Sequence, residues 1–279
     1  MKRIDAHQHF WRYQPARDTW ITPGMSAIAR DFLPADLEPL LAAQQMDGCI
    51  AVQADMSPEE TAFLLGLAKS HVFIKGVVGW IDLRSPTLSD ELETYAAEPR
   101  LLGFRHILQA EPEGFMTSND FVGGVSALAE CDYSYDILVY HHQLQETIRF
   151  IDRLPEMRLV IDHIAKPDIR SGQQKGWAEV LRTIAGFPHV HIKLSGLITE
   201  ADWRHWRVEE ILPYTDLVLE CFGPDRILFG SDWPVCLLAG SYERVIGLAQ
   251  TCIAGLSELD RAKIMGENAI RFYKLNDAV

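Results

Sequence analysis

Two histidines lie one residue apart near the start of the chain, in the stretch RIDAHQHFW at residues 3–11. The apolar and acidic run that precedes them is typical of a short β-strand. Side chains two residues apart in a strand point to the same face, roughly 6.6 Å apart along it. We therefore expect His7 and His9 to present two imidazoles to one metal ion or one carbonyl oxygen. The alternative is a polar strand end whose histidines share no role.

An aspartate with complementary chemistry lies near the other end of the chain. Asp232 follows an apolar run and a Gly-Ser pair in RILFGSDWP, at residues 226–234. A carboxylate at a strand end can bind a metal ion or take a proton from water. The alternative is the N-cap of a following helix, although Pro234 can itself begin that helix. We predict that Asp232 is a general base and a metal ligand.

Two further candidates also end apolar runs. His163, in LVIDHIAKP, is predicted to bind a divalent metal ion, or to orient or deprotonate the attacking water. Its alternative is a hydrogen-bonded histidine of the core. Arg105, in LLGFRHIL, suits a carbonyl, hydroxyl or carboxylate group of a substrate. Its alternative is an ion pair with a loop carboxylate.

Other side chains near the predicted strand ends are candidates for substrate contacts. Three are the histidines His106, His141 and His142. Four are tryptophans whose apolar faces suit a sugar ring, although packing is the stronger alternative for each: Trp11, Trp20, Trp80 and Trp233. A second His-x-His pair, His189 and His191, lies at the start of a predicted strand, and we interpret it as structural.

The elements that must position these residues alternate along the chain. Eight runs have the apolar character of buried strands: 2–8, 48–55, 73–83, 101–108, 135–142, 158–165, 190–197 and 226–234. A helical stretch follows each run, and a final one spans 258–275 with a break expected at Gly266. Eight strand–helix units in about 250 residues predict an α/β fold, a distorted (β/α)8 TIM barrel. A doubly wound sheet competes, but no GxGxxG follows the first strand.

In such a barrel, catalytic side chains lie at the carboxyl ends of the strands. Six of the ten histidines are predicted there. The segment 10–34 is long for a loop after a first strand and carries Pro15, Pro23 and Gly24. We expect it to cover the mouth of the barrel. The whole chain, 1–279, is predicted to form a single domain.

The composition narrows the possible partners and compartment. The 279 residues carry a formal net charge of −13, which argues against nucleic acid or an anionic membrane as a partner. No apolar run approaches the roughly 18 residues of a membrane span, and the first residues lack a secretory apolar segment. Five scattered cysteines without a CxxC pair favour reduced thiols. Together these features favour the cytoplasm.

The sequence resembles the amidohydrolase superfamily, and within it the sugar lactonases of the L-fuconolactonase and L-rhamnono-lactonase type. Five motifs carry the resemblance in order between residues 3 and 234: IDAHQHFW, GFRHI, DHIAKP, KLSGL and GSDWP. By position, His7, His9, His163 and Asp232 match residues of the family site. The resemblance implies that the aspartate is the general base and that the histidines polarise a lactone carbonyl or hold a divalent ion.

The resemblance also limits the metal and leaves alternatives open. Binuclear relatives carry a carbamylated lysine at the end of the fourth strand, where this chain has GFRHIL. It therefore implies at most one metal ion, zinc, which some relatives do without. The implied activity is hydrolysis of a sugar lactone, such as L-fucono-lactone, to the aldonic acid. A zinc-dependent decarboxylase of an acidic aromatic substrate and a non-catalytic sugar-binding barrel are the alternatives. The sugar, the ring size and assembly into a homo-oligomer stay open.

Overall fold

Eight parallel strands form the centre of the fold in the computed structural model, which describes residues 1–275. They are β1 (Ile4–Gln8), β2 (Gly48–Val52), β3 (Ile74–Gly79), β4 (Leu101–Ile107), β5 (Ser134–Leu138), β6 (Leu159–Ile161), β7 (Val190–Leu194) and β8 (Ile227–Phe229). Each strand pairs with the next one along the chain. Every strand overlaps one of the runs predicted from the sequence, so the prediction of a (β/α)8 barrel is confirmed.

The barrel is nearly closed where β8 meets β1. A few backbone hydrogen bonds join them: His9 N donates to Trp233 O at 2.7 Å, and Asp232 N donates to His7 O at 2.8 Å. The buried Asp5 carboxylate adds a bond, because its Oδ1 accepts from Ser231 N at 2.9 Å. This closure brings the first and last candidate motifs side by side, although more than 200 residues separate them in the sequence.

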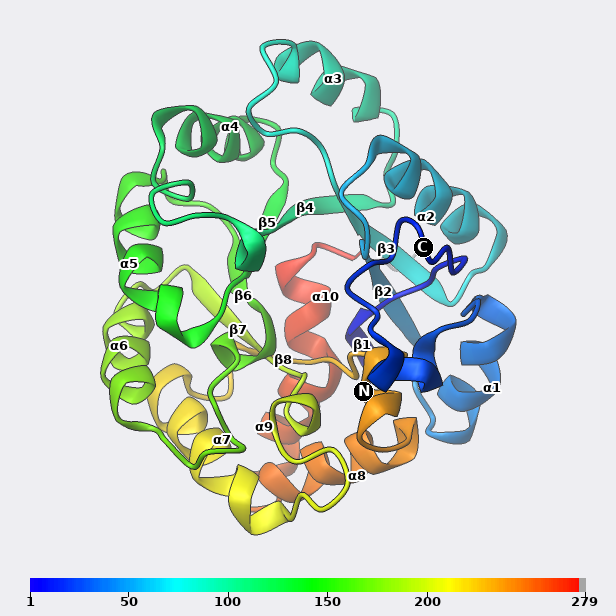
Figure 1. Cartoon of the computed structure of the whole chain (residues 1–279), viewed down its shortest axis with the longest axis vertical. Coiled ribbons are helices and arrows are strands. Elements are labelled where there is room, and N and C mark those ends of the chain that lie inside the picture. Colours follow the sequence, from blue (N-terminus) through cyan, green and yellow to red (C-terminus); the bar gives the residue numbers. More distant parts are fainter. Residues whose placement is uncertain (276–279) are drawn as a thin grey trace.

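Eight helices surround the strands (Figure 1). They are α1 (Pro34–Ala43), α2 (Pro58–Ser70), α3 (Leu88–Tyr95), α4 (Asn119–Glu130), α5 (Leu144–Arg153), α6 (Lys175–Ala185), α7 (Val208–Phe222) and α8 (Tyr242–Cys252). Local sequence fixes several of their starts. At α2, for example, Ser57 Oγ accepts from Glu60 N at 3.2 Å, and Pro58 is the first helical residue.

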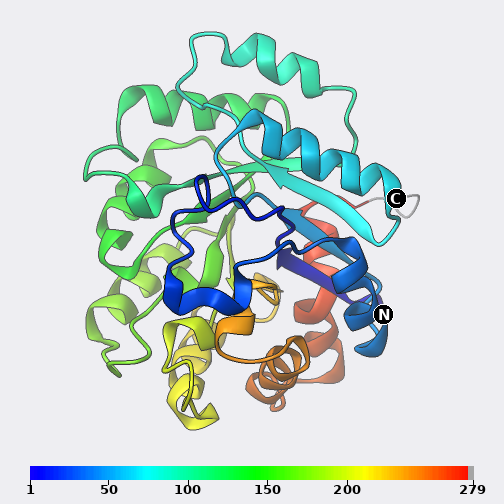
Figure 2. The ribbon, with the colours of Figure 1, turned by 45° about the vertical axis from the view of Figure 1, so that its right-hand side comes forward.

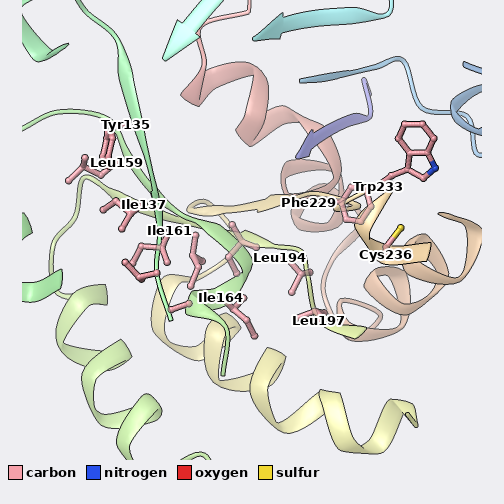
Figure 3. Close-up of a cluster of buried hydrophobic side chains, with 14 of the residues drawn as sticks. Tyr135, Ile137, Leu159, Ile161, Ile164, Leu194, Leu197, Phe229, Trp233 and Cys236 are labelled. Carbon is pink, nitrogen blue, oxygen red and sulfur yellow. The ribbon is translucent and has the colours of Figure 1, made fainter. Parts of the chain in front are cut away.

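The hydrophobic core has two parts. The larger part fills the space between the strands and the surrounding helices, and Figure 3 shows side chains of β5 to β8 in it, among them Ile137, Ile161 and Phe229. The smaller part gathers side chains such as Ile50, Val78 and Leu228 with Phe272. Because alternate residues of a strand face opposite sides, one strand supplies both parts. The layered interior makes the barrel a packed scaffold rather than a pore.

The last helical stretch closes one end of the barrel. It consists of α9 (Glu258–Ala262), a π-helical turn labelled η7 (Lys263–Glu267) and α10 (Asn268–Phe272). The predicted break falls at Gly266, where φ is 177° and ψ is −43°. A Cβ on Gly266 would lie 2.2 Å from Lys2 O, so glycine permits this close approach to the start of the chain. In Figure 1, α10 lies across the middle of the ring of strands.

The segment after β1 lies across the opposite, carboxyl end of the strands (Figure 2). Trp11 and Phe32 exchange backbone hydrogen bonds of 3.0 and 2.9 Å, which close the segment into a loop. It contains the short helix η1 (Pro23–Ile28), which lies against η6 (Val235–Leu238), the short helix after β8. The loop therefore covers the mouth of the barrel as the sequence predicts.

Two further expectations concern the chain as a whole. Every one of the five cysteines is free in the structure, and the reduced state of the thiols stays a prediction. Among residues 1–275, no helix combines the length and the apolar character needed to cross a membrane.

Candidate active site

Four side chains singled out in the sequence meet at the carboxyl ends of β1, β6 and β8. Asp232 Oδ1 lies 3.5 Å from His9 Nε2, 3.8 Å from His163 Nε2 and 3.9 Å from His7 Nε2. His7 Nε2 and His9 Nε2 are 3.2 Å apart. All four residues are buried. The expected meeting of the first and last strands is thus present, while the chemical roles of the four residues stay predictions.

A β-bulge in β1 turns both histidines toward this point. Asp5 pairs with Cys49 of β2, whereas Gln8 pairs with Ala51, so β1 contains one extra residue between these pairs. Asp5 faces outward to Tyr242, whose hydroxyl donates to Asp5 Oδ2 at 3.1 Å. The extra residue reverses the alternation, and His7 therefore faces the barrel interior. Bulges of this kind are common beside active sites.

Each of the three imidazoles has a partner for its second nitrogen. Nδ1 of His9 lies 2.7 Å from Val52 O, Nδ1 of His7 lies 3.2 Å from Asp162 Oδ1, and Nδ1 of His163 lies 2.9 Å from Ser195 Oγ. A carbonyl oxygen only accepts, so the proton of His9 lies on Nδ1. Its Nε2 then offers a lone pair toward Asp232. The Nδ1 atom of His7 also lies 3.1 Å from Lys193 Nζ, an ammonium group that can only donate.

The support for His163 comes from the turn after β7. Ser195 contacts the imidazole, and the next residue, Gly196, has φ of +64°. A Cβ on Gly196 would lie 2.6 Å from His163 Nδ1. Glycine is needed here both for the left-handed backbone and for the close approach to the ring.

The donor set fits one divalent metal ion such as zinc. The ligand atoms of His7, His9 and Asp232 lie within 4.8 Å of one another. Zinc takes imidazole nitrogen and carboxylate oxygen, and histidines that bind it usually donate their other N–H to a carbonyl or carboxylate. Asp162 with His7 and His163 forms a second such group. That carboxylate, however, is already paired with two cations, so the first group is the better candidate.

The two cations belong to a buried ion network that the sequence analysis missed. Lys193 Nζ lies 2.5 Å from Asp136 Oδ2 and 3.1 Å from Asp162 Oδ1. Arg105 Nη1 lies 2.9 Å from Asp162 Oδ2. These side chains are at most 3% exposed, and charges so deep in a protein need partners of opposite sign. A single lysine within the apolar strand VHIKL is the sequence signal for such a network.

Burial and charge together set the protonation of the site. Burial lowers the pKa of His7 and of His163 well below the ordinary value, so both imidazoles are neutral at neutral pH. Burial alone would raise the pKa of Asp162, but Lys193 and His7 hold it well below its usual range. Burial also opposes ionisation of Asp232, yet His163 and its neighbours bring the pKa of that carboxyl below the ordinary value. Asp232 is therefore an ionised proton acceptor at neutral pH.

His163 also begins a left-handed turn that the sequence does not reveal. The φ angles of His163, Ile164, Ala165 and Lys166 are +55°, +47°, +63° and +44°. Left-handed backbone costs roughly 1–2 kcal/mol per L-residue and normally occurs at single residues. Neighbouring groups hold the turn: Trp177 Nε1 donates to Ile164 O at 2.8 Å, and Lys166 N donates to His163 O at 2.8 Å. Such strain is concentrated at functional sites.

A cleft of about 420 Å³ opens next to these residues, a volume in the range of small-molecule sites. Its buried lining includes His9, His163 and Asp232. Aromatic side chains line other parts of it: Trp11, Trp20, Tyr140 and Trp203. Trp11 and Trp20 thus line the cleft, and a contact of either with a sugar ring stays a prediction. Tyr140 and Trp203 were not identified from the sequence.

Arg105 lines the cleft, but its guanidinium is also part of the ion network. Nη2 donates to Gln53 O, and Nη1 lies 3.3 Å from His7 Nε2 as well as contacting Asp162. The alternative of an ion pair is thus realised, with a carboxylate that directly follows β6. These contacts hold the Arg105 guanidinium beside the candidate ligand His7, where it contributes positive charge.

His106 requires a correction, because the structure does not bring it to the cleft. Consecutive residues of β4 face opposite sides, so Arg105 points inward and His106 points toward the surrounding helices. His106 Nε2 lies 2.8 Å from Glu111 Oε1, and its ring stacks on Phe115 with centroids 5.2 Å apart. Trp80 accompanies it, with Nε1 3.4 Å from His106 Nδ1.

The strand-five histidines and Trp233 also differ from the prediction. His142 is exposed and stacks on Tyr140 with centroids 5.6 Å apart, outside the cleft lining. His141 contacts the backbone of the turn after β6 instead of the cleft, because its Nδ1 lies 2.9 Å from Lys166 O. Trp233 is 1% exposed and packs in the core rather than facing a substrate. Asp232 precedes it, so the two side chains point to different sides.

Comparisons with known proteins agree with this geometry. The model of the amidohydrolase family matches residues 4–275. An L-fucono-1,5-lactonase of Burkholderia multivorans is 44% identical over 98% of this chain and 96% of its own length. An L-fucono-1,5-lactonase of Burkholderia ambifaria is 37% identical over the same shares of the two chains. A crystal structure of a Burkholderia multivorans amidohydrolase with bound zinc has a TM-score of 0.96 and 44% identity, covering 99% of this chain and 100% of that one.

Proposed function

The chain belongs to the amidohydrolase family, and we propose that it hydrolyses a sugar lactone to the free aldonic acid, with L-fucono-1,5-lactone as the first candidate substrate. One observation carries the proposal: the Asp232 carboxylate faces the Nε2 atoms of His7, His9 and His163 at the buried end of a cleft. The nearly full-length similarity to two L-fucono-1,5-lactonases supports the choice of substrate class.

In the proposed reaction, Asp232 takes a proton from a water molecule positioned near His163. The water oxygen forms a bond to the lactone carbonyl carbon, and negative charge develops on the carbonyl oxygen. When the tetrahedral intermediate collapses, the bond to the ring oxygen breaks and Asp232 returns its proton to that oxygen. The product is a hydroxy acid, which ionises and acidifies the solution. General base catalysis of this kind contributes about 10²–10⁴-fold.

The residues that would hold a metal ion are His7, His9 and Asp232, with His163 beside them. A zinc ion bound there would supply a Lewis acid that withdraws charge from the carbonyl oxygen. The protein itself orients these ligands through the Nδ1 contacts to Val52 and Asp162. The positive charge of Arg105 adjoins the same place, 3.3 Å from His7 Nε2.

The charges of the cleft favour a neutral substrate over an acidic one. Its two cationic side chains are each paired with a carboxylate: Arg105 with Asp162 at 2.9 Å, and Lys166 with Glu200 at 3.2 Å. The carboxylate of a decarboxylase substrate would find no unpaired side-chain cation in the cleft and would depend on a bound metal ion. A lactone is uncharged and requires no such group, which favours lactone hydrolysis over the decarboxylase alternative.

The experiment that tests the proposal is a pH-indicator screen of aldonolactones, with and without a chelator. We expect acidification with L-fucono-1,5-lactone or a close stereoisomer, above the rate of spontaneous hydrolysis. Asp232→Asn protein is the matched control for contaminating esterases. A parallel assay measures carbon dioxide release from dihydroxybenzoates. Carbon dioxide release without lactone hydrolysis would favour the decarboxylase, and lactone binding without product would favour a sugar-binding barrel.

A further inference from the structure

The left-handed turn after β6 carries a second polar group into the cleft besides His163. Its last residue, Lys166, has φ of +44° and ψ of 63° and precedes Pro167. A residue before proline normally adopts extended backbone, so this conformation is doubly unfavourable. The His141 ring holds the Lys166 carbonyl at 2.9 Å. A strained backbone that the surroundings hold in place is a reason to look for a function of the side chain it directs.

The Lys166 side chain meets a carboxylate from the neighbouring strand connection. Its Nζ lies 3.2 Å from Oε1 of Glu200, the last residue of the short helix η5 (Ile198–Glu200) that follows β7. The Glu200 backbone is fixed as well, because its carbonyl accepts from Arg170 N at 3.0 Å. Both side chains line the cleft that contains Asp232, and they are 19% and 20% exposed. The pair is thus held at the cleft surface rather than free in solvent.

We propose that Lys166 and Glu200 form the specificity-determining pair of the cleft, which recognises hydroxyl groups on the lactone ring. The inference rests on the proposed lactone hydrolysis and deepens it by naming the part of the substrate that the pair contacts. A sugar hydroxyl both donates and accepts a hydrogen bond. The ammonium group has three donors, of which the Glu200 contact uses one, and the carboxylate is an acceptor. Two neighbouring hydroxyls can therefore bond to the pair at the same time.

The charge and the position of the pair argue against two other roles: attraction of the product carboxylate and contact with the reacting ester. Because the ammonium and carboxylate charges offset each other, the pair has no net charge to attract the carboxylate of the product. Within residues 1–275, Lys166 forms an ion pair with Glu200 and none with Asp232, so the pair is placed to bind the ring substituents rather than the ester. Loss of the pair should weaken binding of hydroxylated lactones and leave hydrolysis of the ester itself intact.

The test compares two lactones that share a six-membered ester ring but differ in hydroxyl groups: L-fucono-1,5-lactone and δ-valerolactone. For Lys166→Met we expect kcat/KM on the sugar lactone to fall about 10- to 100-fold, mainly through KM, as for loss of a hydrogen bond to a charged group. Activity on δ-valerolactone, or its inhibition constant against the sugar lactone if turnover is slow, should change less than about threefold. Lys175→Met, at the exposed start of α6, is the matched control.

Two further variants keep the test decisive if Lys166→Met folds poorly. Glu200→Gln preserves the shape of the side chain and should show the same selective loss, while Lys166→Arg should restore part of the sugar-lactone activity. An equal loss on both lactones, or no loss on either, would overturn the assignment of the pair. If the unmodified protein hydrolysed no sugar lactone at all, the proposed function would fail together with this inference. Wild-type hydrolysis with an unselective Lys166→Met defect would remove this inference alone.

Discussion

The chain carries two His-x-His pairs with the same spacing, and their surroundings differ at every level. His7 and His9 end β1, where their Nε2 atoms lie 3.2 Å apart and face Asp232. His189 and His191 lie at the start of β7, at the opposite end of the barrel. There His191 packs against Phe272 of α10 with ring centroids 4.8 Å apart. His189 Nε2 is buried without a hydrogen-bond partner in the described part of the chain.

The two pairs show that the spacing of the histidines and their position along the strand have different consequences. A spacing of two residues places both members of a pair on one face of a strand, wherever the strand lies. Only the carboxyl ends of barrel strands are joined to the long loops that form a cleft. The pair on β1 therefore meets Asp232, which follows β8, and His163, which follows β6. In the second pair, His191 packs against the closing helix. The first is placed for chemistry and the second for packing.

The sharpest contrast is expected between His9→Gln and His191→Gln. His9→Gln removes a group aimed at the point where charge develops, and a loss of about 10²–10³-fold in kcat is typical of such a deletion. His191→Gln should change kcat and KM by less than about twofold, since it lies at the far end of the barrel. Initial rates of lactone hydrolysis measure both, and circular dichroism checks folding. Similar losses in the two variants would erase the proposed distinction between the pairs.

The strand β7 itself offers the next contrast, because Lys193 lies two residues after His191. Lys193→Met leaves Asp136 and Asp162 without their shared cation, and breaking a buried ion pair in this way costs about 3–5 kcal/mol in the free energy of unfolding. Lys69→Met removes a lysine of a surface pair with Glu98 and should cost less than about 1 kcal/mol. Urea denaturation of the two variants measures the difference. A loss for Lys193→Met no greater than for Lys69→Met would show that the network does not stabilise the barrel.

His191, of the second His-x-His pair, should affect the pH dependence of stability rather than the activity. Burial lowers the pKa of His191 from 6.5 to about 4, so the folded protein resists its protonation. As the pH falls from about 6.5 toward 4, the unfolded chain binds this proton and the folded chain does not, and stability is lost. His191→Gln lacks the effect, so its stability relative to wild type should rise by on the order of 2 kcal/mol between pH 7 and pH 4. Parallel stability curves for the two proteins would contradict the buried, neutral state of His191.

Much of this contrast follows from the sequence alone. The eight apolar runs and their alternation with helices predict the barrel, and the barrel then predicts which end of each strand carries chemistry. The sequence therefore predicts that His7, His9, His163 and Asp232 lie together. The structural interpretation of His189 and His191 follows from the same rule.

The other features of the site depend on tertiary contacts, which the pattern of residue types along the sequence does not contain. The position of His106 at a strand end predicts a substrate contact, but its neighbour Arg105 occupies the inward position. The bulge that turns His7 inward has no distinct sequence signature. The left-handed turn from His163 to Lys166 contains no glycine, so nothing in its composition predicts its backbone. The partners of Lys193 come from β5 and from the turn after β6, and they become evident only when the barrel closes.

The central claim is that the carboxylate after the last strand activates water beside the histidines of the first. Asp232→Asn tests it most directly, because asparagine tolerates the left-handed backbone at this position, where φ is +57°, and keeps the side-chain shape. We predict that kcat for sugar-lactone hydrolysis falls at least about 100-fold while the midpoint of thermal unfolding stays close to that of wild type. A folded Asp232→Asn protein that retained more than about a tenth of wild-type kcat would contradict the claim.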